Sequence, residues 1–120
     1  MIILDANLIL RYLLNDNEEM ADTAERFLNT GNAYVTIEVI AEVVYVLKGV
    51  YSMKRTVIAD VIHGFMRLVK CQEPAVLDLA LDTYRKHSID FVDCVLYGYH
   101  QVKGAEIATF DKKLLKLIHA

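Results

Sequence analysis

Short apolar runs that are typical of buried strands alternate along the chain with longer segments whose apolar residues recur at helical spacing. The strand-like runs are residues 2–4, 33–36 and 106–109. No hairpin dipeptide such as Asn-Gly joins two of them, and a helical pattern follows each one. Parallel strands need such crossover segments, whereas antiparallel neighbours are usually joined by tight turns. The sequence therefore predicts an α/β fold, with a central parallel β-sheet flanked by helices on both faces.

Local start and stop signals set the expected helices. Thr36 and Ser52 are candidate caps of two helices. Pro74 suits the first helical position of another helix, and Gly104 suits a helix end. The predicted helical segments are residues 8–14, a helix that starts within 16–19 and stops at Gly31, then 37–50, 54–70, 74–87 and 90–103, and a short helix that Asp111 opens.

The length of 120 residues favours one compact domain, residues 1–120. An apolar content of 55% is high for this length, and it predicts that part of the apolar surface contacts another subunit or a partner. Cys71 and Cys94 are isolated in the sequence, so we expect ordinary core residues rather than a zinc site. No run approaches the roughly 18 apolar residues of a membrane span, and we expect a cytoplasmic protein with no membrane partner.

The charge balance does not decide the class of substrate. The chain has 16 acidic and 13 basic side chains and a formal net charge of −3. Proteins that hold nucleic acid by their own Lys and Arg residues usually show a basic excess. Bound divalent cations reverse the sign of an acidic site, however, so a nucleic-acid substrate stays open.

Three carboxylates lie in unusually apolar surroundings in the sequence. Glu42 and Asp93 are each the only charge in an apolar stretch, and Asp5 directly follows an apolar strand. Structural alternatives exist for two of them. Glu42 could pair with a Lys or Arg or lie at a helix edge, and Asp93 could form a capping box with Asp90. Asp5 is harder to explain in this way, because Asp is a poor strand residue.

The expected sheet would bring acids together. Asp5 and Asp111 both follow predicted strands, and the carboxyl ends of parallel strands share one sheet edge, although Asp111 could also simply cap the last helix. Neighbouring carboxylates raise one another's pKa and need cations, and hard oxygen ligands suit Mg²⁺ or Mn²⁺. Such ions activate water for phosphodiester hydrolysis. No P-loop, dinucleotide loop, EF-hand or zinc-ligand pattern occurs.

Four segments together resemble the PIN-domain ribonucleases and, within them, the VapC-type toxins of prokaryotic toxin–antitoxin pairs. They are Ile2–Arg11, Ala41–Leu47, Asp90–Cys94 and Ala108–Lys113. The resemblance covers essentially the whole chain and implies a single PIN domain. It also implies that four acids bind Mg²⁺ or Mn²⁺ and activate water for RNA cleavage, namely Asp5, Glu42, Asp93 and Asp111.

The same resemblance implies supporting roles. Asn7 matches a polar residue that supports the first acid, Thr109 a small hydroxyl residue before the last acid, and Asp90 an accessory acid. Arg11 is a candidate contact for RNA or for a partner, with a solvated or salt-bridged side chain as the alternative. Cys94 stands where Ala is common, a change that should not affect metal binding.

Partners follow from the resemblance as well. It implies an RNA substrate, often a tRNA, a homodimer, and a cognate antitoxin whose C-terminal segment covers the active-site groove. Phosphate contacts beyond the metal would come from Arg11, Lys48, Lys112 and Lys113. The main alternative is a catalytically inactive PIN-like module that only binds protein. A metal-dependent phosphatase is less favoured, because the segment Asp5-Ala6-Asn7 lacks a second Asp.

Overall fold

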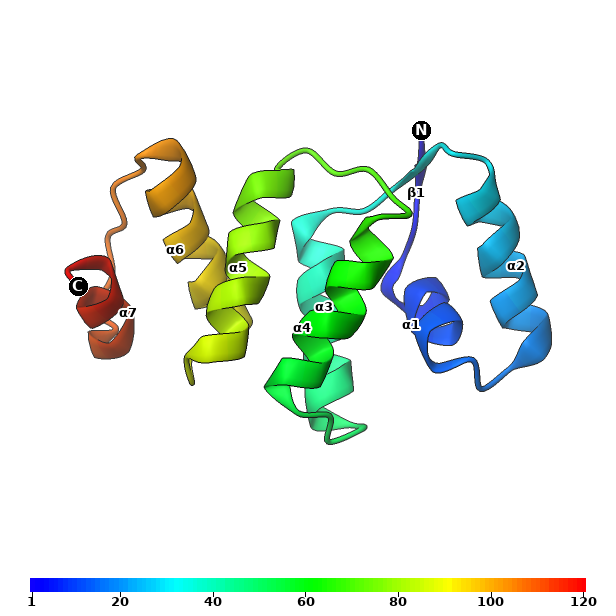
Figure 1. The fold of residues 1–120 in the computed structure, drawn as a ribbon, viewed down its shortest axis with the longest axis horizontal. Helices are drawn as coiled ribbons and strands as arrows, with labels where there is room; N and C mark the ends of the chain where they lie inside the picture. Colours follow the sequence, from blue (N-terminus) through cyan, green and yellow to red (C-terminus); the bar gives the residue numbers. More distant parts are fainter. The chain divides into compact units, whose positions relative to one another are not determined.

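Two compact units, Met1–Gln72 and Glu73–Ala120, make up the chain in the computed structural model, which describes residues 1–120 (Figure 1). None of the helices is long and apolar enough to cross a membrane. The first unit contains β1 (Ile2–Ile3), α1 (Ala6–Leu14), α2 (Glu18–Asn29), β2 (Ala33–Tyr34), α3 (Ile37–Gly49) and α4 (Arg55–Met66). The second contains α5 (Pro74–Lys86), α6 (Phe91–Lys103) and α7 (Lys112–Ile118).

The sheet is small and parallel. β1 pairs with β2 in a register that places Ile2 opposite Ala33 and Ile3 opposite Tyr34. Lys70 extends this sheet beside β2, because its N–H donates to the Ala33 carbonyl at 2.9 Å and its carbonyl accepts from Val35 at 2.9 Å. The predicted α/β class with a parallel sheet is therefore confirmed.

The prediction of a third strand at residues 106–109 is wrong. This segment has no regular secondary structure. Its sequence, Glu106-Ile107-Ala108-Thr109, is short and includes Glu and Ala, which are depleted in strands. A strand is held by hydrogen bonds to a neighbour, and no neighbouring segment supplies them here.

The helix predicted over residues 54–70 is shorter at both ends. α4 begins at Arg55 after the N-cap residue Lys54, and Ser52 is not the cap. Ser52 instead has a positive φ of 50° in the turn after α3. At its other end α4 stops at Met66, which leaves Lys70 free to pair in the sheet.

Side-chain caps explain where four of the helices begin. Asp5, Asn17, Thr36 and Asp111 are the N-cap residues of α1, α2, α3 and α7, and each accepts a hydrogen bond from the backbone N–H three residues later. Such caps satisfy a backbone donor that the helix itself leaves unpaired. The caps at Thr36 and Asp111 are as predicted, whereas the cap at Asp5 was not foreseen.

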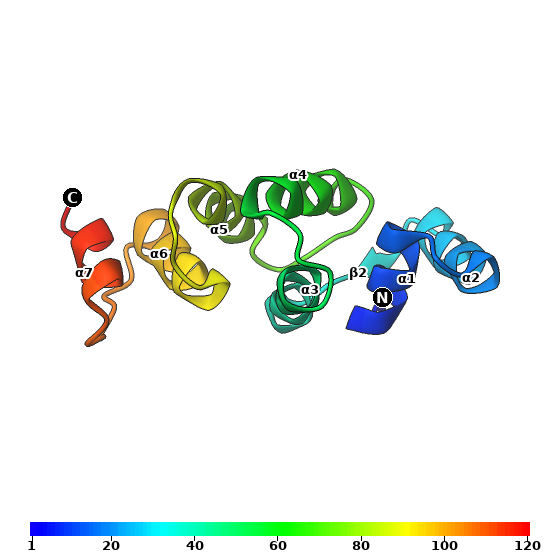
Figure 2. The ribbon, with the colours of Figure 1, turned by 90° about the horizontal axis from the view of Figure 1, so that it is seen from below.

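Each unit packs its helices on apolar faces. In the first unit α1 contacts α2 and α3, and α3 contacts α4; these last two overlap in Figure 1 and separate into layers in Figure 2. In the second unit α6 contacts α5 and α7, and the rings of Tyr84 and Phe91 meet edge to face with centroids 5.8 Å apart. Cys94 is fully buried in α6, as expected for a core cysteine.

Gly98 sets how closely α6 approaches α5. A Cβ atom at this position would lie 2.8 Å from the Val76 carbonyl oxygen, which belongs to the backbone of α5. We expect Gly98→Ala to lower the free energy of unfolding by about 1–3 kcal/mol, the usual range for overpacking. Gly64→Ala is the matched control, because nothing lies within 4 Å of a Cβ there, and Ala should leave stability unchanged or raise it. Urea unfolding of the two variants measures both effects; equal stability in the two would contradict the close packing of α5 and α6.

Candidate functional site

A cleft of about 320 Å³ in the second unit carries three of the candidate acids. Asp90 is the N-cap residue of α6, Asp93 lies in the first turn of α6, and Asp111 is the N-cap residue of α7. Because α6 packs against α7, these carboxylates line the same cleft although Asp111 is distant in sequence. The other lining residues are Ser88, Ile89, Lys112 and Lys113.

Asp90 and Asp93 do not serve helix α6 as a capping box. The side chain of Asp90 makes no capping hydrogen bond, although Asp90 occupies the N-cap position. Neither carboxylate has an ion-pair or hydrogen-bond partner in the structure. The structural alternative that the sequence left open for this pair is thus not realised, and both carboxylates are available to a ligand.

The pKa of Asp93 is raised above its ordinary value. Partial burial is the largest cause, because it disfavours the charged form of the carboxyl group. The negative charges of Asp111 and then Asp90 raise it further. A cation bound in this cleft would relieve both the burial penalty and the repulsion, so the electrostatics of the second unit favour a bound metal ion.

This shift predicts how stability depends on pH. Because the pKa of Asp93 is higher in the folded protein than its ordinary value of 3.8, the folded state binds a proton more tightly than the unfolded chain. The ionised Asp93 therefore lowers the free energy of unfolding, and this destabilisation is complete at pH values above the raised pKa. It disappears as the pH falls toward the ordinary pKa. Without metal, Asp93→Asn should therefore be more stable than the wild type at pH 7, and the difference should shrink on acidification. Urea unfolding from pH 7 to about pH 4 checks this; a constant difference would contradict it.

Asp111 is fixed by two hydrogen bonds at the start of α7. Its Oδ1 atom accepts from the backbone N–H of Leu114 at 2.8 Å, so Asp111 does cap the helix. Its own backbone N–H donates to Oγ1 of Thr109 at 3.0 Å. The structural alternative for Asp111 is therefore realised, but it occupies only one carboxylate oxygen. The hydroxyl group of Thr109 holds the backbone that presents the other oxygen.

Asp5 has a similar geometry in the first unit. It follows β1 and caps α1, with Oδ1 accepting from the backbone N–H of Leu8 at 2.9 Å. It is exposed and lines a cleft of about 410 Å³ together with Asn7 and Arg11. The rest of this cleft comes from Leu8, Asn17, Glu19, Met20 and Thr23.

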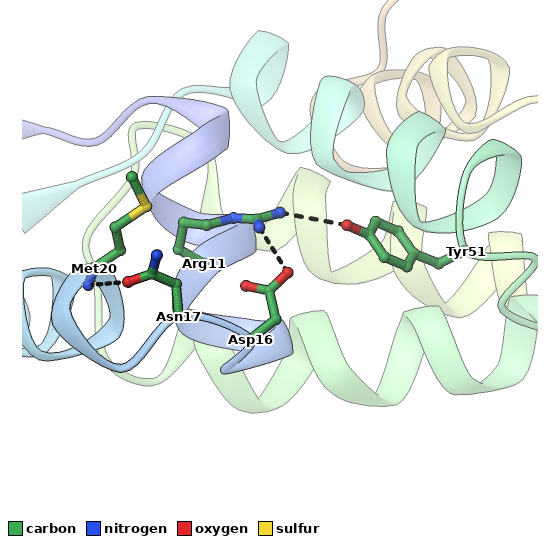
Figure 3. Close-up of polar contacts among 5 residues, drawn as sticks. All are labelled: Arg11, Asp16, Asn17, Met20 and Tyr51. Carbon is green, nitrogen blue, oxygen red and sulfur yellow. Dashed lines mark hydrogen bonds and ion pairs between the residues drawn. The ribbon is translucent and has the colours of Figure 1, made fainter.

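Arg11 is held by two partners from different loops (Figure 3). Its Nη1 atom lies 2.6 Å from Oδ2 of Asp16, and its Nη2 atom donates to the hydroxyl oxygen of Tyr51 at 3.4 Å. The hydrogen bond to Tyr51, followed by the negative charge of Asp16, raises the pKa of Arg11. The salt-bridged alternative is therefore realised. The same side chain still lines the cleft that contains Asp5.

Glu42 lies in the middle of α3 and is exposed. Its side-chain carboxylate has neither an ion pair nor a hydrogen bond. The helix-edge alternative is therefore realised, because Glu42 is exposed while its apolar neighbours turn toward the core. Residues Ala41, Val43 and Val44 beside it are indeed buried.

The structure brings some of the predicted acids together and not others. Asp90, Asp93 and Asp111 share the cleft of the second unit, whereas Asp5 and Glu42 belong to the first unit. No set of three or more His, Cys, Asp or Glu side chains is grouped closely enough to hold a metal ion. The donor chemistry in the second unit still fits Mg²⁺ or Mn²⁺, which prefer carboxylate oxygens.

A comparison with protein-family models matches the PIN domain over residues 2–119. The chain belongs to the PIN-domain family. Neither the curated proteins nor the solved structures that were compared with the chain gave a match. The PIN-domain match runs through both units and includes every candidate acid.

Family membership places this PIN domain on a nuclease-type fold. PIN domains are generally nucleases that depend on divalent metals. Membership in the family also implies nucleic-acid binding. The resemblance seen in the sequence is thus confirmed for the PIN family, while the VapC-type assignment stays a prediction.

Proposed function

We propose that this PIN domain is a Mg²⁺- or Mn²⁺-dependent endoribonuclease. The observation that carries the proposal is the cleft of the second unit, in which Asp90 and Asp93 have no protein partners and Asp111 keeps one free oxygen. If these carboxylates served only to stabilise the fold, we would expect more of them to be paired with cations or hydrogen-bond donors of the protein. Carboxylates that repel one another in a chain of this family are best explained by a divalent cation.

The proposed metal ligands are Asp5, Glu42, Asp93 and Asp111. Support comes from the family match, which treats residues 2–119 as one PIN domain, and we propose accordingly that residues 1–120 act as a single domain. Asp5 and Asp111 suit this role because each uses one oxygen as a helix cap and has a second oxygen for a ligand. Asn7 lies in the cleft with Asp5 and would support that acid.

The chemistry needs no Ser, Cys or His nucleophile. A divalent ion in such a site supplies the charge that activates water and stabilises the leaving oxygen of a phosphodiester. The residues of this chain would position that ion and the RNA. Hydrogen bonds from Leu8 and Leu114 fix the carboxylates of Asp5 and Asp111, and Thr109 fixes the backbone at Asp111. Asp90 adds negative charge beside Asp93 and so favours cation binding.

The biological setting is part of the same proposal. The VapC-type motifs support a toxin of a toxin–antitoxin pair that acts on RNA, tRNA included, in the cytoplasm. A homodimer and a cognate antitoxin would be its protein partners. The sequence resemblance supports each of these assignments, and the high apolar content of the chain fits protein partners.

The test is cleavage of RNA by the purified chain, freed of any bound partner. Labelled total tRNA and a pool of single-stranded RNA are incubated with Mg²⁺, with Mn²⁺ and with a chelator. We expect discrete products with either metal and none with the chelator. Cleavage that persists in the chelator would contradict the metal mechanism. Absence of both cleavage and metal binding would favour the protein-binding module instead.

A further inference from the structure

Phe110 is the most exposed large apolar side chain of the chain, at 101% of its reference accessibility. Met1 and Val50 follow at 72% and 71%. A fully exposed phenylalanine forgoes the burial that normally stabilises an aromatic ring in a folded protein. Its ring contacts no other aromatic ring. Packing within the second unit therefore does not account for Phe110.

The backbone on both sides of Phe110 is fixed. Thr109 accepts a hydrogen bond from the backbone N–H of Asp111, and Asp111 caps α7. Phe110 is thus the residue at the centre of a hydrogen-bonded turn that ends in a candidate metal ligand. Adjacent Cα atoms are about 3.8 Å apart, so the backbone of Phe110 lies directly beside Asp111, which lines the acidic cleft.

Two lysines follow at a place that does not favour cations. Lys112 and Lys113 form the start of α7, and no acidic residue lies in its first turn. A helix N-terminus carries a partial positive charge, so these lysines weaken the helix. Both also line the acidic cleft, and Nζ of Lys113 donates to the Ser88 carbonyl across it at 3.4 Å. The two lysines therefore add positive charge to the cleft in which the RNA phosphates would bind.

We propose that Phe110 stacks against an unpaired nucleobase of the RNA, while Lys112 and Lys113 contact the adjoining phosphates. An exposed aromatic ring beside backbone-binding cations is how proteins hold single-stranded nucleic acid. A phosphate-linked base matches both features, whereas an apolar protein surface would use the ring but not the lysines. This inference rests on the proposed nuclease function. It adds a preference for single-stranded over double-stranded RNA, because the face of a base within a duplex is covered by its stacked neighbours.

Direct binding tests the inference without any need for cleavage. The probe is a short single-stranded RNA oligonucleotide, labelled for anisotropy, with Ca²⁺ in place of Mg²⁺; the same strand in a duplex is the comparison. Stacking predicts that Phe110→Ala weakens binding of the single strand about 5- to 150-fold. Phe110→Leu, which keeps apolar bulk but has no aromatic face, should weaken it similarly, and Phe110→Trp should retain it. Binding of the duplex should change little in any variant.

The absence of tryptophan from this chain provides a second readout. Phe110→Trp introduces a single indole whose fluorescence should be quenched when a base stacks on it. Phe27→Trp places the indole on α2 as a control and should show no quenching. Wild-type affinity in Phe110→Ala or Phe110→Leu, or equal fluorescence with and without RNA in Phe110→Trp, would overturn the proposal. So would a change in oligomeric state with unchanged RNA affinity, since Phe110 would then be a protein contact.

The outcomes separate this inference from the nuclease function. If RNA binding depends on the ring of Phe110 but the wild type does not cleave RNA with Mg²⁺, the stacking role is retained and the nuclease function is rejected. Cleavage by the wild type together with unchanged RNA binding by Phe110→Ala would reject the stacking role alone.

Discussion

Asp93→Asn should lose more than about 100-fold of the metal-dependent cleavage rate. Changes to residues that only orient a metal ligand already cost roughly 10- to 100-fold in metal affinity or activity, so loss of a ligand's charge should cost more. Asn has almost the same shape as Asp, and removing the partly buried charge relieves the repulsion from Asp111 and Asp90. The variant should therefore be folded and inactive. The measurement is the initial rate of cleavage of the RNA identified with the wild type.

Asp82→Asn is the matched control for this change. Asp82 lies on α5 in the same unit, its side chain is 52% exposed, and its ion pair with Arg85 is long at 3.9 Å. A surface pair of this kind contributes little to stability. The control removes the same charge from the chain and should leave cleavage near the wild-type rate. Equal losses in both variants would mean that net charge, rather than a site at Asp93, controls activity.

Asp5→Asn should reduce cleavage as severely as Asp93→Asn, and the double variant should be no worse than either single variant. Residues that serve one catalytic unit show such non-additive losses, whereas independent sites add. Asn is also a good N-cap, so the substitution keeps the hydrogen bond that starts α1 while it removes the charge. The measurement is a double-mutant cycle: the cleavage rates of the wild type, the two single variants and the double variant are compared with one RNA at saturating Mg²⁺.

A control in the first unit guards this second prediction. Asp22→Asn removes an exposed charge from α2 and should leave the rate unchanged. If the losses in Asp5→Asn and Asp93→Asn instead multiply in the double variant, the two acids act on separate steps. The proposal that both acids bind the same metal ion would then be wrong.

The helices could be predicted well because their signals are local. The apolar period, the caps at Thr36 and Asp111, Pro74 at the start of α5 and the left-handed Gly104 after α6 all lie within or beside the helix that they define. The strands could not be predicted equally well, because a strand exists only where another segment pairs with it. Lys70, which no apolar pattern marks, pairs beside β2, whereas residues 106–109 pair with nothing.

The candidate site divides in the same way. Asp93 could be found because a lone charge in an apolar stretch is partly buried and its pKa is raised. The same pattern was misleading at Glu42, where one position of an otherwise buried helix is exposed. The pairing of Arg11 with Tyr51 joins residues 40 apart in sequence and has no local signal. Phe110 carried a signal that went unused, an aromatic residue directly before a candidate metal ligand and two lysines.

Calorimetric titration of Mn²⁺ into the wild type, Asp5→Asn and Asp93→Asn tests the central claim most directly, because it measures metal binding in the absence of RNA. The account predicts that the wild type binds Mn²⁺ and that each single variant loses this binding. Asp22→Asn and Asp82→Asn should bind as the wild type does. Wild-type affinity for Mn²⁺ in Asp5→Asn, or no binding to the wild type at all, would contradict it.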